Sequence, residues 1–314
     1  MNTIPNDRPP TKPLTPEHAK GARLLIGWVP EDFACAALAG PAAMPPYSAE
    51  IRERIHRAQQ VVRERPAIDR TQPVISEAPA ALAPYVAELT VKPFFQSFRA
   101  EGWRVCMADL RHVQVIQWKI QTAHAAERAE TAADDDVSSL AKITLPLSRA
   151  KELTGNGWSL DGRMFMVTCR NPMLRVVPLQ LPGFANPVFV TLEDVVEQTT
   201  GLELKRVSFH LLIDNSQVQV VRWRGAYFLR DGNHRAFGLF TRGITDIPVL
   251  YREYTDNEDP GLPKAEIFDP AVYLGERPPM LADFLDETVA APVDVRSTQK
   301  TFLFQVIEND VPLL

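Results

Sequence analysis

The stretch from Tyr227 to Gly238 reads YFLRDGNHRAFG, and it decides the fold predicted for this chain. An apolar strand-like run ends at the turn pair Asp231 and Gly232. The residues that follow have the apolar spacing of a short helix. Polar residues therefore fill the first turn of that helix, directly after a sharp bend.

The flanking residues extend this pattern in both directions. Residues 218–223 are strand-like, and Arg224-Gly225 marks a tight turn, so a hairpin is expected before the bend. Gly243 is a helix stop, and residues 247–251 are strand-like again. The predicted unit is strand, turn, strand, tight turn, helix, strand.

The first turn of the predicted helix favours an anion. Free backbone N–H groups and the positive end of the helix dipole lie there, and glycine permits close approach of a ligand. An arginine fork matches phosphate oxygens, and a histidine adds a donor. The predicted phosphate-binding residues are Arg230, Gly232, Asn233, His234 and Arg235.

Asp231 cannot bind an anion directly. Its predicted roles are to cap the helix, to orient Arg235, or to hold a divalent metal between itself and the phosphates. Asp231 and His234 are the candidate catalytic residues, and Asp231 is the candidate metal ligand. The alternative is a plain turn, with Asn233 as a helix cap and surface residues after it.

These residues resemble the signature of the ParB/sulfiredoxin-like superfamily, in which a strand leads into a G-x-[HR]-R turn and a helix. The similarity covers about 217–252, with a looser likeness at residues 104–129. It implies an α+β fold with a mixed-sheet core, and phosphates of ATP or CTP bound with Mg²⁺ at the turn. Asn233 stands where sulfiredoxins have a cysteine and ParB-type CTPases a glutamate, so neither reaction is expected.

Three functions are open on the sequence alone. The first is a nucleotide-dependent phosphotransferase, hydrolase or switch. The second is a DNA-binding protein or nuclease whose basic residues grip a phosphate backbone. The third is a non-catalytic interaction module that binds a partner or forms a homodimer. The local charge favours the first two, because eight basic and three acidic residues lie between Lys205 and Arg252.

The rest of the chain is expected to flank this core. The predicted divisions are a disordered Pro-rich tail over 1–16, a mostly helical region over 17–100, a core over 101–258 with an insertion at about 130–205, and a C-terminal extension over 259–314 that packs on the core.

Individual elements are predicted from local signals. Apolar residues spaced by three and four predict a helix over 51–62, with Ser48 as its N-cap and Pro66 as its stop. Thr191 and Gly201 bracket a second predicted helix. Strands are predicted over 164–169 and 301–307, and a helix over 280–289.

Composition limits the class of protein. The 314 residues include 45% hydrophobic and 23% charged residues, as in ordinary globular proteins, and the net charge of −5 argues against a nucleic-acid coat protein. The three cysteines, Cys35, Cys106 and Cys169, form no CxxC pair. With no membrane span and no export signal evident, we expect a cytoplasmic protein without membrane partners.

Overall fold

The computed structural model describes residues 21–40, 42–132, 136–147, 217–262 and 267–294 with their side chains, and the backbone of seven strands outside those ranges. The predicted tail over 1–16 lies outside the described residues. The chain divides into two compact units. Unit 1 comprises Met1–Leu147 and Ser216–Arg296, and unit 2 comprises Ser148–Asn215 and Ser297–Leu314.

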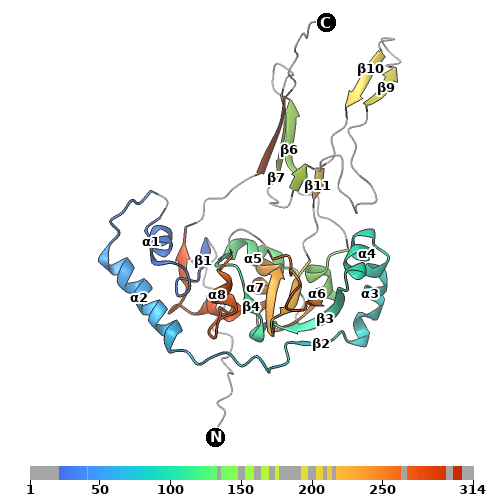
Figure 1. Cartoon of the computed structure of the whole chain (residues 1–314). Coiled ribbons are helices and arrows are strands. Elements are labelled where there is room, and N and C mark those ends of the chain that lie inside the picture. The colour runs from blue at the N-terminus through green and yellow to red at the C-terminus, as the bar shows by residue number, and fades with distance from the viewer. Residues whose placement is uncertain are drawn as a thin grey trace. The chain divides into compact units, whose positions relative to one another are not determined.

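A six-stranded mixed sheet forms the centre of unit 1 (Figure 1). The β12–β14 and β13–β4 pairs are parallel, and the other pairs are antiparallel. The α+β class expected from the sequence is therefore confirmed. In sheet order, the strands are β2 (Ile75–Glu77), β3 (Arg104–Asp109), β14 (Asp246–Glu253), β12 (Gln219–Trp223), β13 (Ala226–Asp231) and β4 (Gln114–Val115).

The predicted hairpin is present as β12 and β13. Its ends pair Trp223 with Ala226, which leaves Arg224 and Gly225 as a two-residue turn. Both turn residues have positive φ, 50° and 72°, as the twist of a two-residue hairpin requires. The hairpin delivers Asp231 to the end of β13, where the bend begins.

The regions predicted to flank the core contribute strands to it. A three-stranded sheet in unit 1 places β1 (Ala22–Leu24) between β5 (Lys119–Gln121) and β15 (Ala291–Val293). Strand β2 pairs with β3 of the central sheet. The boundaries at residues 100 and 259 thus differ from the observed division, because pairing between distant segments leaves no local signal in sequence.

Helices accompany the sheet. They are α1 (Glu31–Ala39), α2 (Ala49–Glu64), α3 (Ala83–Thr90), α4 (Pro93–Ala100), α5 (Thr122–Ala129), α6 (Val137–Thr144), α7 (Asn233–Thr241) and α8 (Pro270–Tyr273), with the 3₁₀ turns η1 (Ala80–Leu82), η2 (Leu110–His112) and η3 (Leu281–Leu285). Part of the helix predicted over 280–289 is therefore 3₁₀.

The prediction for α2 is confirmed in detail. The Ser48 hydroxyl accepts a hydrogen bond from the Ile51 N–H, as an N-cap does, and the helix ends before Pro66. Ile55 and Ala58 are fully buried, because the apolar stripe faces the core.

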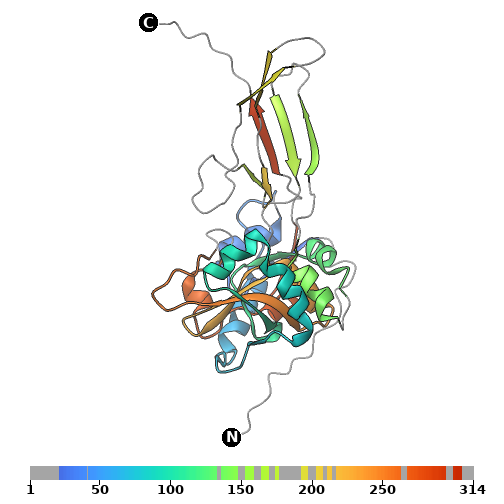
Figure 2. The same ribbon diagram turned by 90° about the vertical axis from the view of Figure 1, so that its right-hand side faces the viewer.

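Unit 2 is built from short antiparallel strands. Its three-stranded sheet has the order β16-β7-β6, and Figure 2 shows these strands side by side. Two further pairs are β9–β10 and β8–β11. The bounds are β6 (Leu153–Trp158), β7 (Met164–Cys169), β8 (Leu174–Val176), β9 (Leu192–Val196), β10 (Glu203–Val207), β11 (Leu211–Ile213) and β16 (Lys300–Gln305).

Two predictions over unit 2 have opposite outcomes. The strands predicted over 164–169 and 301–307 are confirmed as β7 and β16, which pair with each other. The helix predicted between Thr191 and Gly201 is wrong, because residues 192–196 form β9 and pair with β10. The cap-like pattern there is overridden by strand pairing. The insertion predicted at 130–205 overlaps the longer segment of unit 2, and the last residues of the chain join it.

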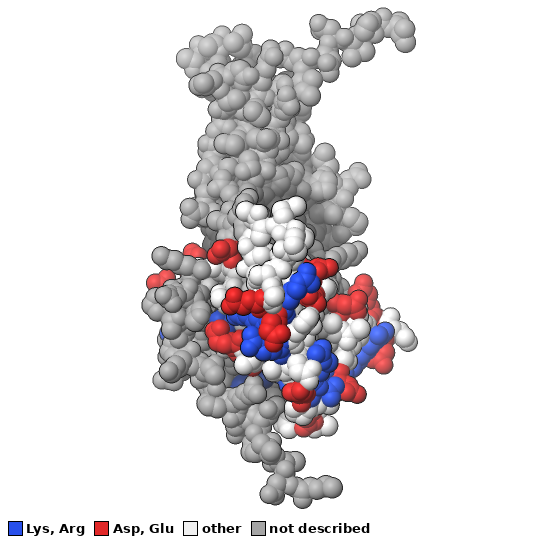
Figure 3. All heavy atoms as spheres, turned by 90° about the vertical axis from the view of Figure 1, so that its left-hand side faces the viewer, with Lys and Arg blue, Asp and Glu red and all other residues white. Residues whose placement is uncertain are grey.

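Two further properties of the described residues bear on function. None of their helices combines the length and the apolar character that a membrane span needs. On the face shown in Figure 3, Lys and Arg side chains are interspersed with Asp and Glu.

Candidate functional site

The bend after β13 depends on glycine. Gly232 has a φ of 81°, and a Cβ at this position would lie 2.7 Å from the Cα of Val218. A side chain is thus excluded by both conformation and space. Asp231 Oδ1 accepts the Gly232 N–H at 2.6 Å, which holds the bend, and α7 begins at the next residue.

Helices α5 and α7 pack against each other (Figure 1), and the hydrogen bonds at their two ends show that they run in the same direction. At their N-terminal ends, the Gln121 N–H donates a hydrogen bond to Nε2 of His234 over 3.2 Å. At their C-terminal ends, the Arg242 guanidinium donates hydrogen bonds to the carbonyls of Ala129 and Ala132. The N-termini of both helices therefore lie next to each other at the same end of the pair.

Gly238 allows the two helices to pack backbone against backbone. A Cβ at this position would lie 2.1 Å from the carbonyl oxygen of Ala125, in the middle of α5. No side chain can occupy that space without moving a helix. The close approach brings the partial charges of the two helix ends together.

The electrostatic environment at these N-termini is positive. Neither α5 nor α7 has an acidic residue in its first turn. The pKa of His234 is lowered from 6.5 to about 4, first by burial and then by the charges of His124, Arg128, Arg235 and Lys119. The His124 ring also packs edge-on against His234, with the centroids 5.1 Å apart.

The two ends of this helix pair differ in the way nearby side chains act on the helix dipoles. Parallel helices place like partial charges side by side, about half an elementary charge at each end. At the C-termini, Arg242 offsets the negative ends through its hydrogen bonds to the carbonyls of Ala129, Glu130 and Ala132, at and just after the end of α5. Near the N-termini, Lys119, His124 and Arg235 add positive charge instead, and Arg128 in the last turn of α5 also acts on His234. An anion bound there would be stabilised by both helices and by these side chains.

Asn233, the first residue of α7, adds a buried polar group. It is 3% exposed, and its Oδ1 has no hydrogen-bond partner among the residues that the structure describes. A buried acceptor without a partner costs about 1–3 kcal/mol. A ligand hydroxyl at this position would remove that cost.

Arg230 lies away from this cluster. The Arg230 guanidinium donates hydrogen bonds to Gln219 Oε1 and to the Gly261 carbonyl, and it lies 5.1 Å from the Trp103 ring. These contacts give no support to its predicted role in phosphate binding.

A metal at the site would depend on the ligand. Among the described residues, no group of three or more His, Cys, Asp or Glu side chains could hold a metal ion by itself. Mg²⁺ is commonly held by one or two carboxylates together with substrate phosphates, and Asp231 fits that arrangement. Another carboxylate of unit 1, Asp109, accepts hydrogen bonds from Arg111 and His112.

Three basic residues of the cluster were not singled out from the sequence as site residues: Lys119, His124 and Arg128. Their positive charges all act on His234. The available signal was the spacing of four between His124 and Arg128, which places both on one face of α5. That signal alone does not reveal that α5 packs along α7.

Comparison with known proteins gives no assignment. No family model matches the chain, and no curated protein or solved structure matches it. The ParB/sulfiredoxin-like resemblance remains a prediction from the motif at Gly232 to Arg235, and the candidate site is defined by its geometry.

Proposed function

We propose that unit 1 binds a nucleoside di- or triphosphate, such as ATP or CTP, with its phosphates at the joined N-termini of α5 and α7. The observation that carries this proposal is the parallel packing of two helices whose N-terminal ends lie near Lys119, His124 and Arg235. The positive charges of Lys119, Arg128 and Arg235 all act on His234, and a polyphosphate complements them.

Each group has a distinct part in the proposed complex. Arg235 supplies a bidentate fork, and Lys119 and Arg128 supply further positive charge from β5 and α5. His234 is neutral at pH 7 because its pKa is about 4. An anion beside it favours the imidazolium form, so binding and protonation of His234 are coupled.

Binding, as in a nucleotide-dependent switch, is better supported than turnover. The two candidate catalytic groups already have structural contacts, since Asp231 accepts the Gly232 N–H and His234 accepts the Gln121 N–H. Phosphoryl transfer would also require a positioned acceptor and metal ligands.

The test is isothermal titration of the full chain with ATP, CTP, GTP and ADP, each with and without Mg²⁺. We expect binding by the wild type and a loss of about tenfold or more in affinity for Arg235→Ala and for Arg128→Ala, since each removes a charge-assisted contact.

Two control variants define specificity. Arg57→Ala removes the same charge from an exposed position on α2 and is expected to leave affinity unchanged. Arg230→Ala is also expected to bind normally, because its guanidinium contacts Gln219 and Gly261. Failure of the wild type to bind any of the four nucleotides would overturn the proposal, as would normal binding by both Arg235→Ala and Arg128→Ala.

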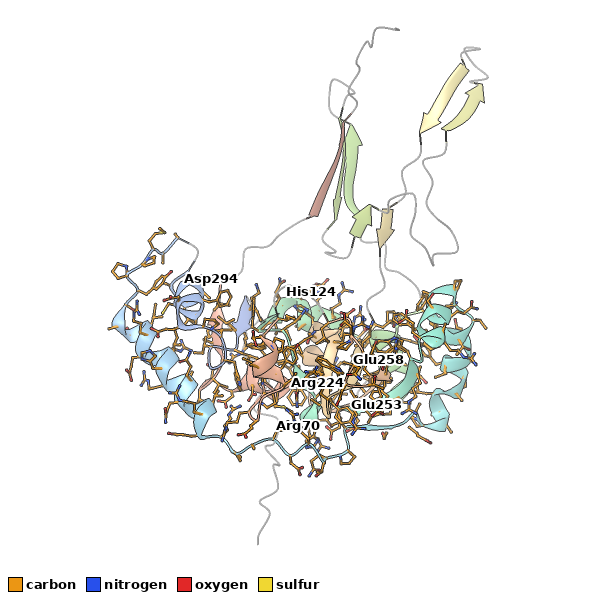
Figure 4. The ribbon with its side chains drawn as sticks, viewed as in Figure 1. Arg70, His124, Arg224, Glu253, Glu258 and Asp294 are labelled. Atoms are coloured by element: carbon orange, nitrogen blue, oxygen red, sulfur yellow. The ribbon has the colours of Figure 1, made fainter. Side chains whose placement is uncertain are left out.

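A second candidate function, binding of single-stranded nucleic acid, is favoured by a different set of residues. Arginines lie over aromatic rings around one end of the central sheet. Trp103, Tyr251 and Tyr254 are buried, whereas Trp223 and Tyr227 are partly exposed, and exposed aromatic rings beside arginines bind bases and phosphates together. Figure 4 labels Arg224, which belongs to this set, and His124 of the basic cluster. The stacked pairs are Arg104–Tyr251, Arg222–Tyr227, Arg224–Trp223, Arg230–Trp103 and Arg252–Tyr254.

Salt dependence distinguishes this candidate. Fluorescence anisotropy with a labelled oligonucleotide should show an affinity that falls steeply between about 50 and 200 mM salt. Arg224→Ala should weaken that binding, whereas Arg128→Ala should not. An affinity that does not change with salt would exclude this function.

A further inference from the structure

We propose that an aromatic pocket in unit 1 binds an alkylated ammonium group, as found in choline-like molecules and methylated amines. The pocket has a volume of about 380 Å³ and is lined by Trp28, Trp118, Phe268 and Asp269, with Val29, Pro30 and Val272 completing its walls. This volume suits a small molecule. The proposal is independent of nucleotide binding, because none of the lining residues belongs to the basic cluster around His234.

The orientation of the rings favours a rounded cation over a flat ligand. The ring planes of Trp118 and Phe268 meet at 82°, with their centroids 6.4 Å apart. Phe33, which is 42% exposed, lies against Trp118 at 5.1 Å and 51°. A flat ring stacks best between parallel faces, whereas steeply angled faces surround a compact cationic group.

Trp28 is held in place on its own side of the pocket. Its indole Nε1 donates a hydrogen bond to the Arg277 carbonyl at 2.8 Å. The guanidinium of Arg65 lies 5.1 Å from the ring, and that charge is paired with Asp283 and Asp286. The ring is therefore held in a fixed orientation.

Asp269 gives the pocket a negative charge. It is the charged residue among those that line the pocket, and its Oδ1 accepts the Ala271 N–H at 2.8 Å, which fixes the carboxylate at the start of α8. An ionised carboxylate accepts hydrogen bonds and donates none, so it attracts cations and repels phosphates. Aromatic faces and one carboxylate together select an ammonium group.

The experiment compares matched probes on the full chain. Choline and tetramethylammonium are titrated calorimetrically against 3,3-dimethylbutan-1-ol, an uncharged molecule with nearly the shape of choline. We expect choline to bind about tenfold or more tightly than the alcohol, since only the cation gains from the rings and the carboxylate.

Substitutions locate the binding. Trp118→Ala should weaken choline binding by about tenfold, Trp118→Phe by about threefold or less, and Asp269→Asn by about threefold to tenfold. Asp136→Asn is the matched control, because Asp136 caps α6 with the same contact that Asp269 makes at α8, and it should bind choline normally.

Several outcomes would overturn the proposal. They are no choline binding, equal binding of the uncharged alcohol, or unchanged choline affinity in both Trp118→Ala and Asp269→Asn. If Trp118→Ala does not fold, Trp28→Leu takes its place, because Trp28 lines the pocket and is partly exposed. Unchanged choline affinity in both Trp28→Leu and Asp269→Asn would then overturn the proposal.

Discussion

The pKa of His234 reflects the electrostatics of its surroundings. Its pKa of about 4 reflects burial first and the nearby positive charges second. The imidazole is therefore neutral at pH 7 and accepts a hydrogen bond through Nε2. Protonation places one more positive charge at the N-termini of two helices, which is unfavourable unless an anion is present.

This shift predicts a specific loss of stability in acid. Because the pKa of His234 is lower in the folded state than in the unfolded state, protons bind preferentially to the unfolded chain as the pH falls from about 6.5 towards 4. Between pH 7 and pH 5, His234 should reduce the free energy of unfolding by about 1–2 kcal/mol. Above pH 7 it has no effect.

Urea denaturation of the wild type and His234→Gln at both pH values measures this contribution. All other groups titrate alike in the two proteins, so the variant should lose less stability than the wild type between pH 7 and pH 5. Identical losses would show that the histidine is not perturbed. A saturating nucleotide should raise the pKa of His234, as read from its ring proton by NMR.

At the scale of elements, α5 and α7 act as a pair joined at start, middle and end. Gly238 sets their distance, and Arg242 closes the C-terminal end on the carbonyls of Ala129 and Ala132. The basic cluster exists only because this packing brings α5 beside α7.

Gly238→Ala tests this packing. The added methyl group would lie 2.1 Å from the Ala125 carbonyl, so one helix must shift. We expect a loss of about 3 kcal/mol or more in the free energy of unfolding, measured with urea. Gly243→Ala, where φ is 85° but no atom lies within 4 Å, should cost only about 1 kcal/mol. Equal losses for the two variants would contradict a packing role for Gly238.

Prediction from sequence succeeded where a few neighbouring residues decide the structure. Arg224-Gly225 specifies a hairpin turn, Gly232 a bend and Ser48 a helix cap, and all three are observed. It failed at residues 192–196, where pairing with 203–207 outweighs a cap-like pattern. The role of His124 was likewise beyond reach, because it depends on which helix packs against α5.

At the scale of the whole molecule, unit 1 consists of two chain segments that contact each other where they are interrupted by residues 148–215. The chain leaves unit 1 after Leu147 and returns at Ser216. At the two sides of this gap, the Val218 N–H donates a hydrogen bond to the Thr144 carbonyl at 2.8 Å, and Gln217 Nε2 donates one to the Pro146 carbonyl. No sequence signal showed that these two points are neighbours, which is why the predicted insertion limits of 130 and 205 were displaced.

This contact between the two segments predicts that unit 1 folds alone. A variant that joins Leu147 to Ser216 through a short Gly-Ser linker and ends at Arg296 should unfold in one cooperative transition. Its nucleotide affinity should stay within about threefold of the full chain if the site lies wholly in unit 1. Circular dichroism during heating and calorimetric titration measure the two properties.

A larger deletion provides the control. Removing α6 as well should abolish the transition, because Leu140 and Ala141 are buried in the core. An unfolded product from the smaller deletion would show that unit 1 needs unit 2 to fold.

Because the Gln121 amide donates a hydrogen bond to His234, its hydrogen-exchange rate depends on the protonation state of that histidine. While the imidazole is neutral, the amide proton is held by Nε2 and should exchange slowly with solvent deuterium. A ligand that protonates the imidazole removes the acceptor and frees the amide, so exchange at Gln121 should quicken when a polyphosphate binds, even as the neighbouring amides of α7 become better protected. The exchange rate of the Gln121 amide, at the start of α5, would thus report the charge on His234 of α7.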